Sequence, residues 1–191
     1  MLTVILAGGG SRRMGRDKAM LPFCGETLLQ YQINKFQRLG PVAVSVNEHG
    51  RFPFVGASEI VDAYPGCGPL NGVVGGFAAS EDEELFLTAV DLPYGEPELV
   101  SKLAELRGDA DVCVISGDDG RAEPLFAVYG RNCAAAAAEC LSAGKKSVLD
   151  LFDLVCVRHV RPEELPEFDL EKILLNVNTP DMYRNIVQIS E

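Results

Sequence analysis

A glycine-rich cationic loop follows the first apolar segment of the chain, in the stretch LAGGGSRRMGRDKAM that begins at Leu6. Glycines allow backbone amides to approach phosphate oxygens closely, and nearby cations balance the phosphate charge. Between Gly8 and Lys18 the loop carries four cations, Arg12, Arg13, Arg16 and Lys18, and its one acidic residue is Asp17. Its net charge is therefore +3. This pattern suits binding of a triphosphate. The alternative is a tight turn whose arginines are solvated.

Two common phosphate-binding motifs do not fit this loop. The dinucleotide fingerprint GxGxxG fails because Arg13 stands where the third glycine belongs. The phosphate loop GxxxxGK begins at Gly10 and reaches Gly15, but Arg16 and Asp17 then replace its lysine and the hydroxyl residue that follows. The loop therefore has the glycines and cations by which these motifs bind phosphate, but it matches neither motif.

Polar residues follow apolar runs at three other places. Asp91 comes directly after LFLTAV, Asn47 after VAVSV, and Asp62 after a shorter run. Mg²⁺ prefers a few carboxylates together with phosphate oxygens, so an acidic residue at a strand end can hold it beside a nucleotide. The alternatives are local: Asp91 can cap the turn before Pro93, and Asn47 can end its strand through its own side-chain turn.

Two further segments combine glycine, proline and asparagine. After Asp62 the chain reads AYPGCGPLNG, which contains Gly68; close backbone packing alone accounts for such glycines. Near the end, the element NVNTP starts at Asn176. Asn178 or Thr179 can cap the helix that the proline begins, but capping leaves Asn176 without a role.

Apolar runs of strand length alternate with segments of helical period. Strands are expected at 3–7, 42–46, 85–90, 111–115, 125–129 and 154–160, and helices at 26–39, 73–79, 97–106 and 132–143. This alternation predicts a single α/β domain over 1–191, Rossmann-like and three-layered, with a mostly parallel sheet and helices on both faces. In such a sheet, ligands bind at the carboxyl ends of the strands, which is where the polar residues above are expected.

The composition limits the classes of partner. Of the 191 residues 47% are hydrophobic, and the net charge is −11. This acidity argues against a protein that coats nucleic acid, which needs a broad cationic surface. No apolar run approaches the roughly 20 residues of a membrane span, and no basic leader with a hydrophobic block opens the sequence, so we expect a cytoplasmic protein without membrane contact. The six scattered cysteines lack metal-ligand spacing and are expected to be buried, reduced thiols.

The opening loop resembles the signature of the molybdenum cofactor guanylyltransferases, LAGG-x-S-x-R-M-G-x-D-K, within the wider class of MobA-like nucleotidyltransferases. The chain matches each defined position from Leu6 to Lys18. Further along, VDLP at Asp91, the aspartate before the GPL-x-G turn, R-x-x-PL-F from Arg121 and the closing NVNTP are similar to elements of that family in the same order. The resemblance covers nearly the full length of the chain.

This resemblance implies roles for particular residues. The loop would wrap the triphosphate, Lys18 and Arg13 would stabilise it and the departing pyrophosphate, and Asp91 would hold Mg²⁺, with Mn²⁺ as the alternative ion. The implied catalytic residues are Lys18, Arg13 and Asp91; the nucleotide-binding residues are Leu6, Ala7, Gly8, Gly9, Gly10, Ser11, Lys18, Asn47, Asp62, Gly68 and Asp91; and the residues facing a pterin substrate are Asn176, Asn178 and Arg121.

The reaction that the resemblance implies is transfer of GMP from GTP to molybdopterin. The terminal phosphate of molybdopterin attacks the α-phosphorus of GTP, pyrophosphate leaves, and molybdopterin guanine dinucleotide forms. The implied fold is nucleotide-diphospho-sugar transferase-like, with the nucleotide at about 1–95 and the pterin at about 96–191. Beyond the two substrates, a molybdenum-insertion protein and apo-molybdoenzymes are the implied partners.

Other functions stay open at this point. The related molybdopterin cytidylyltransferases use CTP, but their loop reads LAAG where this chain has LAGG from Leu6. Sugar-phosphate nucleotidyltransferases are disfavoured by the NVNTP ending and the short chain. A nucleotide-binding module without catalysis would not need both Lys18 and Asp91, and a nicotinamide-dependent oxidoreductase is disfavoured by the broken GxGxxG pattern.

Overall fold

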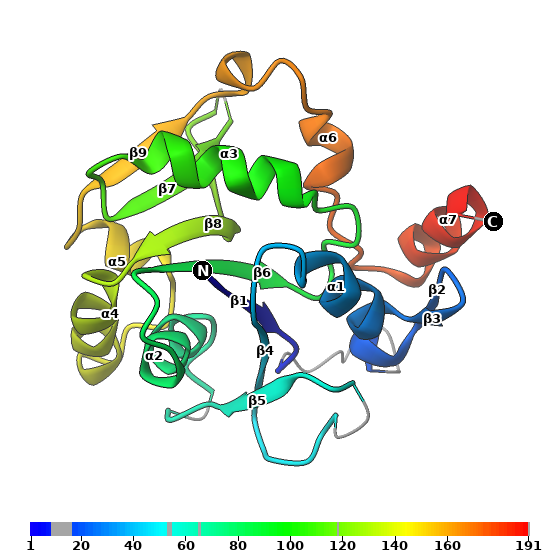
Figure 1. The fold of residues 1–191 in the computed structure, drawn as a ribbon, viewed down its shortest axis with the longest axis horizontal. Helices are drawn as coiled ribbons and strands as arrows, with labels where there is room; N and C mark the ends of the chain where they lie inside the picture. The colour runs from blue at the N-terminus through cyan, green and yellow to red at the C-terminus, as the bar shows by residue number, and fades with distance from the viewer. Residues whose placement is uncertain (9–16, 53–54, 65, 118, 191) are drawn as a thin grey trace.

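One sheet of seven strands runs through the middle of the computed structural model, which describes residues 1–8, 17–52, 55–64, 66–117 and 119–190 (Figure 1). In sheet order the strands are β5 (Ser58–Val61), β4 (Val42–Val46), β1 (Leu2–Leu6), β6 (Glu84–Ala89), β8 (Ala122–Gly130), β7 (Val112–Ser116) and β9 (Val157–Val160). Neighbouring strands are parallel, except that β8 lies antiparallel to β6 and to β7. A small separate hairpin pairs β2 (Pro22–Phe23) with β3 (Glu26–Thr27).

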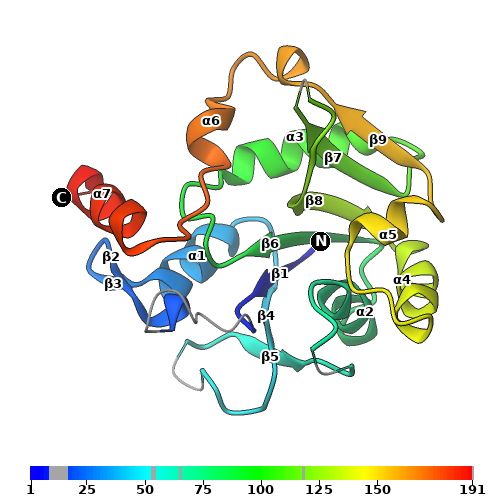
Figure 2. The same ribbon diagram turned by 180° about the vertical axis from the view of Figure 1, so that it is seen from behind.

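Helices cover both faces of the sheet (Figure 1, Figure 2). They are α1 (Leu28–Phe36), α2 (Leu70–Ala79), α3 (Pro97–Arg107), α4 (Cys133–Ser142), α5 (Leu149–Phe152), α6 (Leu170–Ile173) and α7 (Pro180–Ser190). Successive residues of a strand point to opposite faces of the sheet. In β1, Ile5 therefore belongs to the core beneath α1 and α3, and Val4 to the core beneath α2 and α4. The predicted three-layer α/β architecture is confirmed. Within the described part of the chain, no helix is long and apolar enough to cross a membrane.

The direction of β8 differs from that of the other strands because of its short connection to β7. The turn between them closes with the Gly117 amide donating to the Arg121 carbonyl at 2.9 Å. A parallel neighbour needs a crossover of a dozen or more residues, so this turn permits only a hairpin. The prediction of a mostly parallel sheet therefore holds with one antiparallel strand inside it.

The cysteines are all free, but the expectation that they are buried holds for only three of the six. Cys113, Cys133 and Cys140 are buried. Cys67 is half-buried, and Cys24 and Cys156 are exposed. Cys24 lies in the turn of the β2–β3 hairpin, beyond the packed layers, which explains its exposure.

Strand β1 lies at a topological switch point, where the strand order of the sheet reverses. The chain leaves β1 through α1 to reach β4 on one side, and later passes through α2 to reach β6 on the other. Both neighbours are parallel to β1, and Leu6 pairs with Ala89 at the ends of β1 and β6. A switch of this kind leaves a crevice at the carboxyl ends of the strands. The residues that follow these strands therefore meet at one edge of the sheet.

Candidate active site

A cleft of about 820 Å³ lies at this edge of the sheet. Its walls come from the ends of β1, β4 and β6, from the segment after β5, from the start of β8 and from the segment before α7. The residues singled out from the sequence that line it are Leu6, Gly8, Lys18, Asn47, Asp62, Gly68, Asp91, Asn176 and Asn178. Residues far apart in the sequence thus meet in one cleft.

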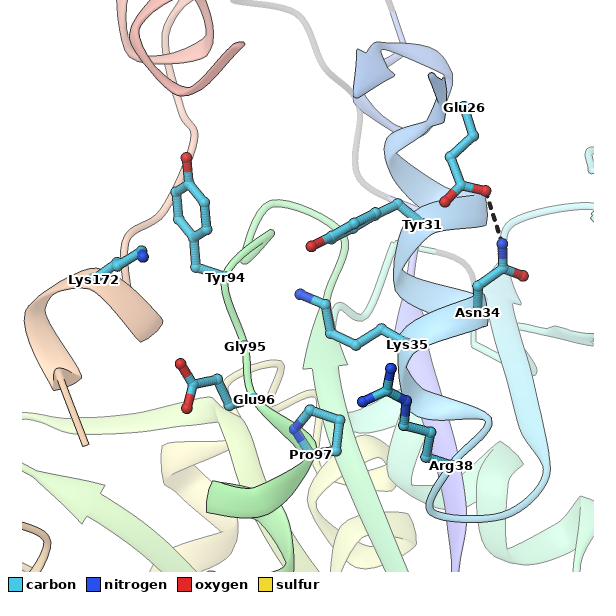
Figure 3. Close-up of a pocket in the computed structure, with 10 residues that line it drawn as sticks. All are labelled: Glu26, Tyr31, Asn34, Lys35, Arg38, Tyr94, Gly95, Glu96, Pro97 and Lys172. Atoms are coloured by element: carbon cyan, nitrogen blue, oxygen red, sulfur yellow. Dashed lines mark hydrogen bonds between the residues drawn. The ribbon is translucent and has the colours of Figure 1, made fainter. Parts of the chain in front are cut away.

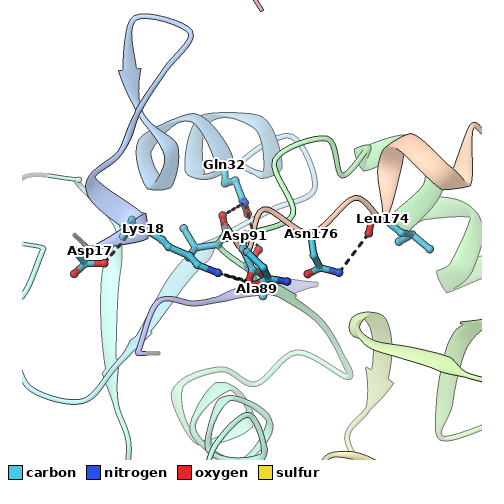
Figure 4. Close-up of polar contacts among 10 residues, drawn as sticks. Asp17, Lys18, Gln32, Ala89, Asp91, Leu174 and Asn176 are labelled. Atoms are coloured by element: carbon cyan, nitrogen blue, oxygen red, sulfur yellow. Dashed lines mark hydrogen bonds and ion pairs between the residues drawn. The ribbon is translucent and has the colours of Figure 1, made fainter. Parts of the chain in front are cut away.

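Lys18 joins three parts of the chain in this cleft. Its Nζ donates to Asp91 Oδ2 at 3.0 Å and to Asn178 Oδ1 at 2.8 Å; Figure 4 shows the lysine reaching across to the aspartate. The side chains of Lys18 and Asp91 are only 16% and 20% exposed, so their attraction is screened less than that of a surface pair. The local turn is fixed by Asp17, whose carboxylate accepts from the Ala19 amide at 3.1 Å.

The segment before α7 is tied directly to the aspartate. The amide of Val177 donates to the Asp91 carbonyl at 2.8 Å, so Asn176 and Asn178 are held on either side of that contact. The N-terminal turn of α7 is capped by Thr179, whose Oγ1 accepts from the Met182 amide at 3.2 Å. Since the threonine provides the cap, Asn178 is available to contact Lys18.

The opposite wall holds Asp62 and Asn47. The Ser45 hydroxyl donates to Asp62 Oδ1 at 2.9 Å, and burial raises the pKa of Asp62 while this hydrogen bond partly opposes the shift. Asn47 Nδ2 donates to the Gly8 carbonyl at 2.8 Å. A Cβ at Gly8 would lie 2.8 Å from Asn47 Oδ1, so the glycine is what lets the amide come so close.

Some predicted residues lie elsewhere. Ala7 is buried beside the cleft and donates its amide to the Ser45 carbonyl at 3.1 Å. Arg121 does not line the cleft; its side chain is 89% exposed in the turn before β8, where it pairs with Asp119 at 3.4 Å. The loop residues Gly9, Gly10, Ser11 and Arg13 lie outside the described residues.

Sequence reasoning missed two residues near Asp91. Glu123 stands at the start of β8, and burial together with the charge of Asp91 raises its pKa, against hydrogen bonds from Leu125 and Asn176. Gln32 of α1 is fully buried and donates to the carbonyl of Ala89 (Figure 4). A sequence signal existed for Gln32, since it is a polar residue on the apolar stripe of an amphipathic helix.

The donors in the cleft fit a cation that is shared with phosphate. Among the described residues, no group of three or more histidine, cysteine, aspartate or glutamate side chains forms a metal site. Asp91 and Asp62 supply carboxylates to the cleft, and Asp91 already pairs with the cation of Lys18. Mg²⁺ is commonly bound by one or two carboxylates plus substrate phosphates. The residues present therefore fit Mg²⁺ that arrives with a nucleotide.

A second pocket, of about 460 Å³, lies between α1, the segment after Asp91 and α6 (Figure 3). Within it, Lys35 Nζ donates to the Pro93 carbonyl at 2.5 Å and lies 4.5 Å from the centre of the Tyr31 ring. Burial lowers the pKa of Lys35 from its ordinary 10.5 to about 8, with Arg38 adding to the shift and Glu96 and Cys24 opposing it.

The pKa of Lys35 predicts a pH dependence of stability. Between pH 8 and 10.5 the unfolded chain holds more protons at this amine than the folded chain, so the free energy of unfolding should rise with pH across this window. Denaturant unfolding measures this free energy for the wild type and for Lys35→Met. Between these pH values the free energy of unfolding of the wild type should rise relative to that of the variant, and below pH 8 the difference between the two should be constant. An exposed-lysine variant, Lys146→Met, is the matched control. Parallel curves for wild type and Lys35→Met would contradict the prediction.

Known proteins are similar to this chain in sequence and in fold. Residues 3–160 match the model of the MobA-like NTP transferase domain. The chain is 33% identical over 190 residues to a probable molybdenum cofactor guanylyltransferase of Carboxydothermus hydrogenoformans, covering 98% of this chain and 96% of that one. A protein of the same name from Pelotomaculum thermopropionicum is 35% identical over 181 residues, covering 93% and 87%.

Solved structures resemble the fold at lower identity. The molybdopterin-guanine dinucleotide biosynthesis protein A of Archaeoglobus fulgidus superposes with a TM-score of 0.85 at 24% identity, covering 99% of this chain and 98% of that one. The 2-C-methyl-D-erythritol 4-phosphate cytidylyltransferase of Thermus thermophilus gives 0.66 at 17% identity, covering 97% of each chain. The fold is thus that of nucleotidyltransferases, and the sequence match shows that the chain belongs to the MobA-like NTP transferase family.

Proposed function

We propose that this chain transfers GMP from GTP to molybdopterin, with release of pyrophosphate and formation of molybdopterin guanine dinucleotide. The main support is the cluster in which Lys18 contacts both Asp91 and Asn178. It brings Lys18, a strand-end carboxylate and the C-terminal asparagines into one cleft. The names of the relatives from Carboxydothermus and Pelotomaculum agree with this reaction.

The side chains of the cleft serve a reaction between two anions. Lys18 would neutralise charge on the triphosphate, while Asp91 would hold Mg²⁺, or Mn²⁺ in its place. When bound, the metal ion polarises the phosphate oxygens and stabilises the leaving pyrophosphate. The acceptor phosphate is already ionised at neutral pH, so the chain needs to supply position and charge.

Lys18 has a different partner before and after the nucleotide binds. Without nucleotide its ammonium neutralises Asp91. A bound triphosphate would offer this ammonium a stronger anionic partner, and the Asp91 carboxylate would then be available to hold the divalent ion that accompanies the nucleotide. Both part-buried charges would then stay paired, which avoids the cost of an isolated buried charge.

The acceptor side of the cleft is assigned to the C-terminal segment. Asn176 and Asn178 present amide groups that both donate and accept hydrogen bonds, as the edge of a pterin ring requires. Arg121 lies at the same edge of the sheet but outside the cleft, where it can reach only a part of the acceptor that extends beyond the walls.

CTP is the main alternative nucleotide. The related cytidylyltransferases carry alanine where this chain has Gly8, and here a Cβ at that position would lie 2.8 Å from Asn47 Oδ1. An alanine would therefore require the Asn47 amide to shift. The names of the relatives from Carboxydothermus and Pelotomaculum favour GTP over CTP for the present chain. A nucleotide-binding module without catalysis is disfavoured by the Lys18–Asp91 pair.

The further partners stay predictions. A molybdenum-insertion protein and apo-molybdoenzymes would deliver the substrate and take the product, as the resemblance implies. The cytoplasmic location and the division at about residue 95 are likewise predictions.

Pyrophosphate release tests the proposed reaction. The full chain is supplied with Mg²⁺ and molybdopterin, together with GTP or CTP. Release should need both molybdopterin and GTP, and CTP should be used at least about tenfold less well, as for loss of one or two hydrogen bonds to the base. Equal or better use of CTP would overturn the guanine assignment, and release from neither nucleotide would overturn the reaction.

Replacing Asp91 with asparagine should remove the metal anchor and keep the shape of the side chain. We expect kcat to fall by about 10²-fold or more, with thermal unfolding close to that of the wild type. The matched control is Asp119→Asn, which removes an exposed carboxylate outside the cleft and should leave the rate unchanged. Normal turnover of Asp91→Asn with Mg²⁺ would show that this carboxylate does not hold the ion.

Asn178→Ala separates acceptor binding from helix capping. The change should raise KM for molybdopterin by about tenfold, as for loss of one or two hydrogen bonds, and affect KM for GTP less. Thr179→Ala is the control, because it removes the cap of α7 and should cost about 1 kcal/mol of stability without a specific change in KM. If Asn178→Ala alters stability alone, the asparagine has no role toward the acceptor.

A further inference from the structure

Gln32 is a buried polar side chain in an apolar setting. It is 0% exposed and lies on the inner face of α1 with Leu28, Leu29, Ile33 and Phe36. Burial of an amide is unfavourable unless its groups are hydrogen-bonded. Within the described part of the chain, its Oε1 has no partner. The benefit of an amide here must therefore come from its other end.

The NH₂ group of Gln32 contacts the end of β6. Nε2 donates to the Val90 carbonyl at 2.8 Å and to the Ala89 carbonyl at 3.3 Å, and Figure 4 shows the amide pointing from α1 to this strand end. The sheet bond from the Val90 amide to the Leu6 carbonyl, at 3.1 Å, lies at the same point. Gln32 thus holds the backbone where the chain leaves the sheet, one residue before Asp91.

Lys35 makes a similar contact one helical turn later. Residues three apart lie on the same side of a helix, and Lys35 Nζ donates to the Pro93 carbonyl at 2.5 Å. Figure 3 shows its side chain extending from α1 toward the segment after β6. One face of α1 therefore binds carbonyls on both sides of Asp91.

The carbonyl of Asp91 itself is held from the other direction. It accepts the amide of Val177 at 2.8 Å. The backbone around the carboxylate is thus fixed between α1 and the segment that carries Asn176 and Asn178. An error in this backbone would move Asp91 relative to Lys18 and to the acceptor residues at once.

We propose that Gln32 and Lys35 are positioning residues that fix the backbone of Asp91, and so the place of the carboxylate in the cleft. Their relevance to catalysis rests on the proposed function. Neither residue lines the cleft, so they act through the segment 89–93. Mg²⁺ demands near-ideal coordination geometry, which makes the metal site sensitive to small shifts of this segment.

The test compares Gln32→Met with Ile33→Val in the full chain. The methionine keeps the length of the side chain and removes both donors, whereas Ile33→Val, at the next buried position of α1, only removes a methyl group. Lys35→Met is the second positioning variant and keeps the test decisive if Gln32→Met does not fold.

The first readout is amide hydrogen exchange without nucleotide. Exchange at Leu92, whose amide donates to the Ala89 carbonyl, and at Val177, whose amide donates to the Asp91 carbonyl, should be about tenfold faster in Gln32→Met than in the wild type, as for loss of about one strong hydrogen bond. Ile33→Val should leave the ratio of these rates to those of the central strands unchanged.

The second readout is binding of Mn²⁺ in the presence of GTP, measured by electron paramagnetic resonance. Gln32→Met and Lys35→Met should weaken it by about five- to tenfold, with KM for GTP changed less than about threefold and kcat lowered. The proposal would be overturned if the positioning variants exchange these amides and bind Mn²⁺ as the wild type does. Equally large changes in exchange rate and Mn²⁺ affinity in Ile33→Val would also overturn it. If the wild type transfers no nucleotide, the proposed function fails, while the exchange rates still decide whether α1 fixes the segment.

Discussion

The contact of one ammonium group with two distant parts of the chain organises the candidate site. Lys18 Nζ lies at hydrogen-bond distance from Asp91 and from Asn178. Both charges are mostly buried, and a buried charge is costly unless it is paired. Lys18, the end of β6 and the segment before α7 therefore meet at one point of the cleft.

The fold makes this contact possible through the position of β1. Because β4 and β6 flank β1 in parallel, the residues after three strands open toward the same edge. Polar contacts then fix the edge residues: Asn47 holds the Gly8 carbonyl, and Val177 holds the Asp91 carbonyl. The helix α1 adds a second support for the backbone beside the aspartate, through Gln32 and Lys35, which do not line the cleft.

Sequence patterns predicted the layers, the strand ends and most of the residues that line the cleft. These features depend on patterns among neighbouring residues: apolar periodicity, the placement of glycines, and polar residues that follow apolar runs. The direction of β8 was not predicted, since it depends on a turn that closes between Gly117 and Arg121. Arg121 follows the family pattern but lies outside the cleft. The contacts of Gln32 and Lys35 join residues nearly sixty positions apart, which no local pattern reveals. The roles of the loop residues Gly9 to Arg13 stay predictions.

A crystal structure with GTP and Mn²⁺ tests the central claim most directly, because the anomalous signal of the ion locates it independently of the nucleotide. The account predicts the ion within coordination distance of the Asp91 carboxylate, the triphosphate against Lys18 Nζ, and Lys18 displaced from Asp91. Nucleotide bound outside the cleft, or an ion remote from Asp91 while Lys18 still pairs with it, would contradict the account.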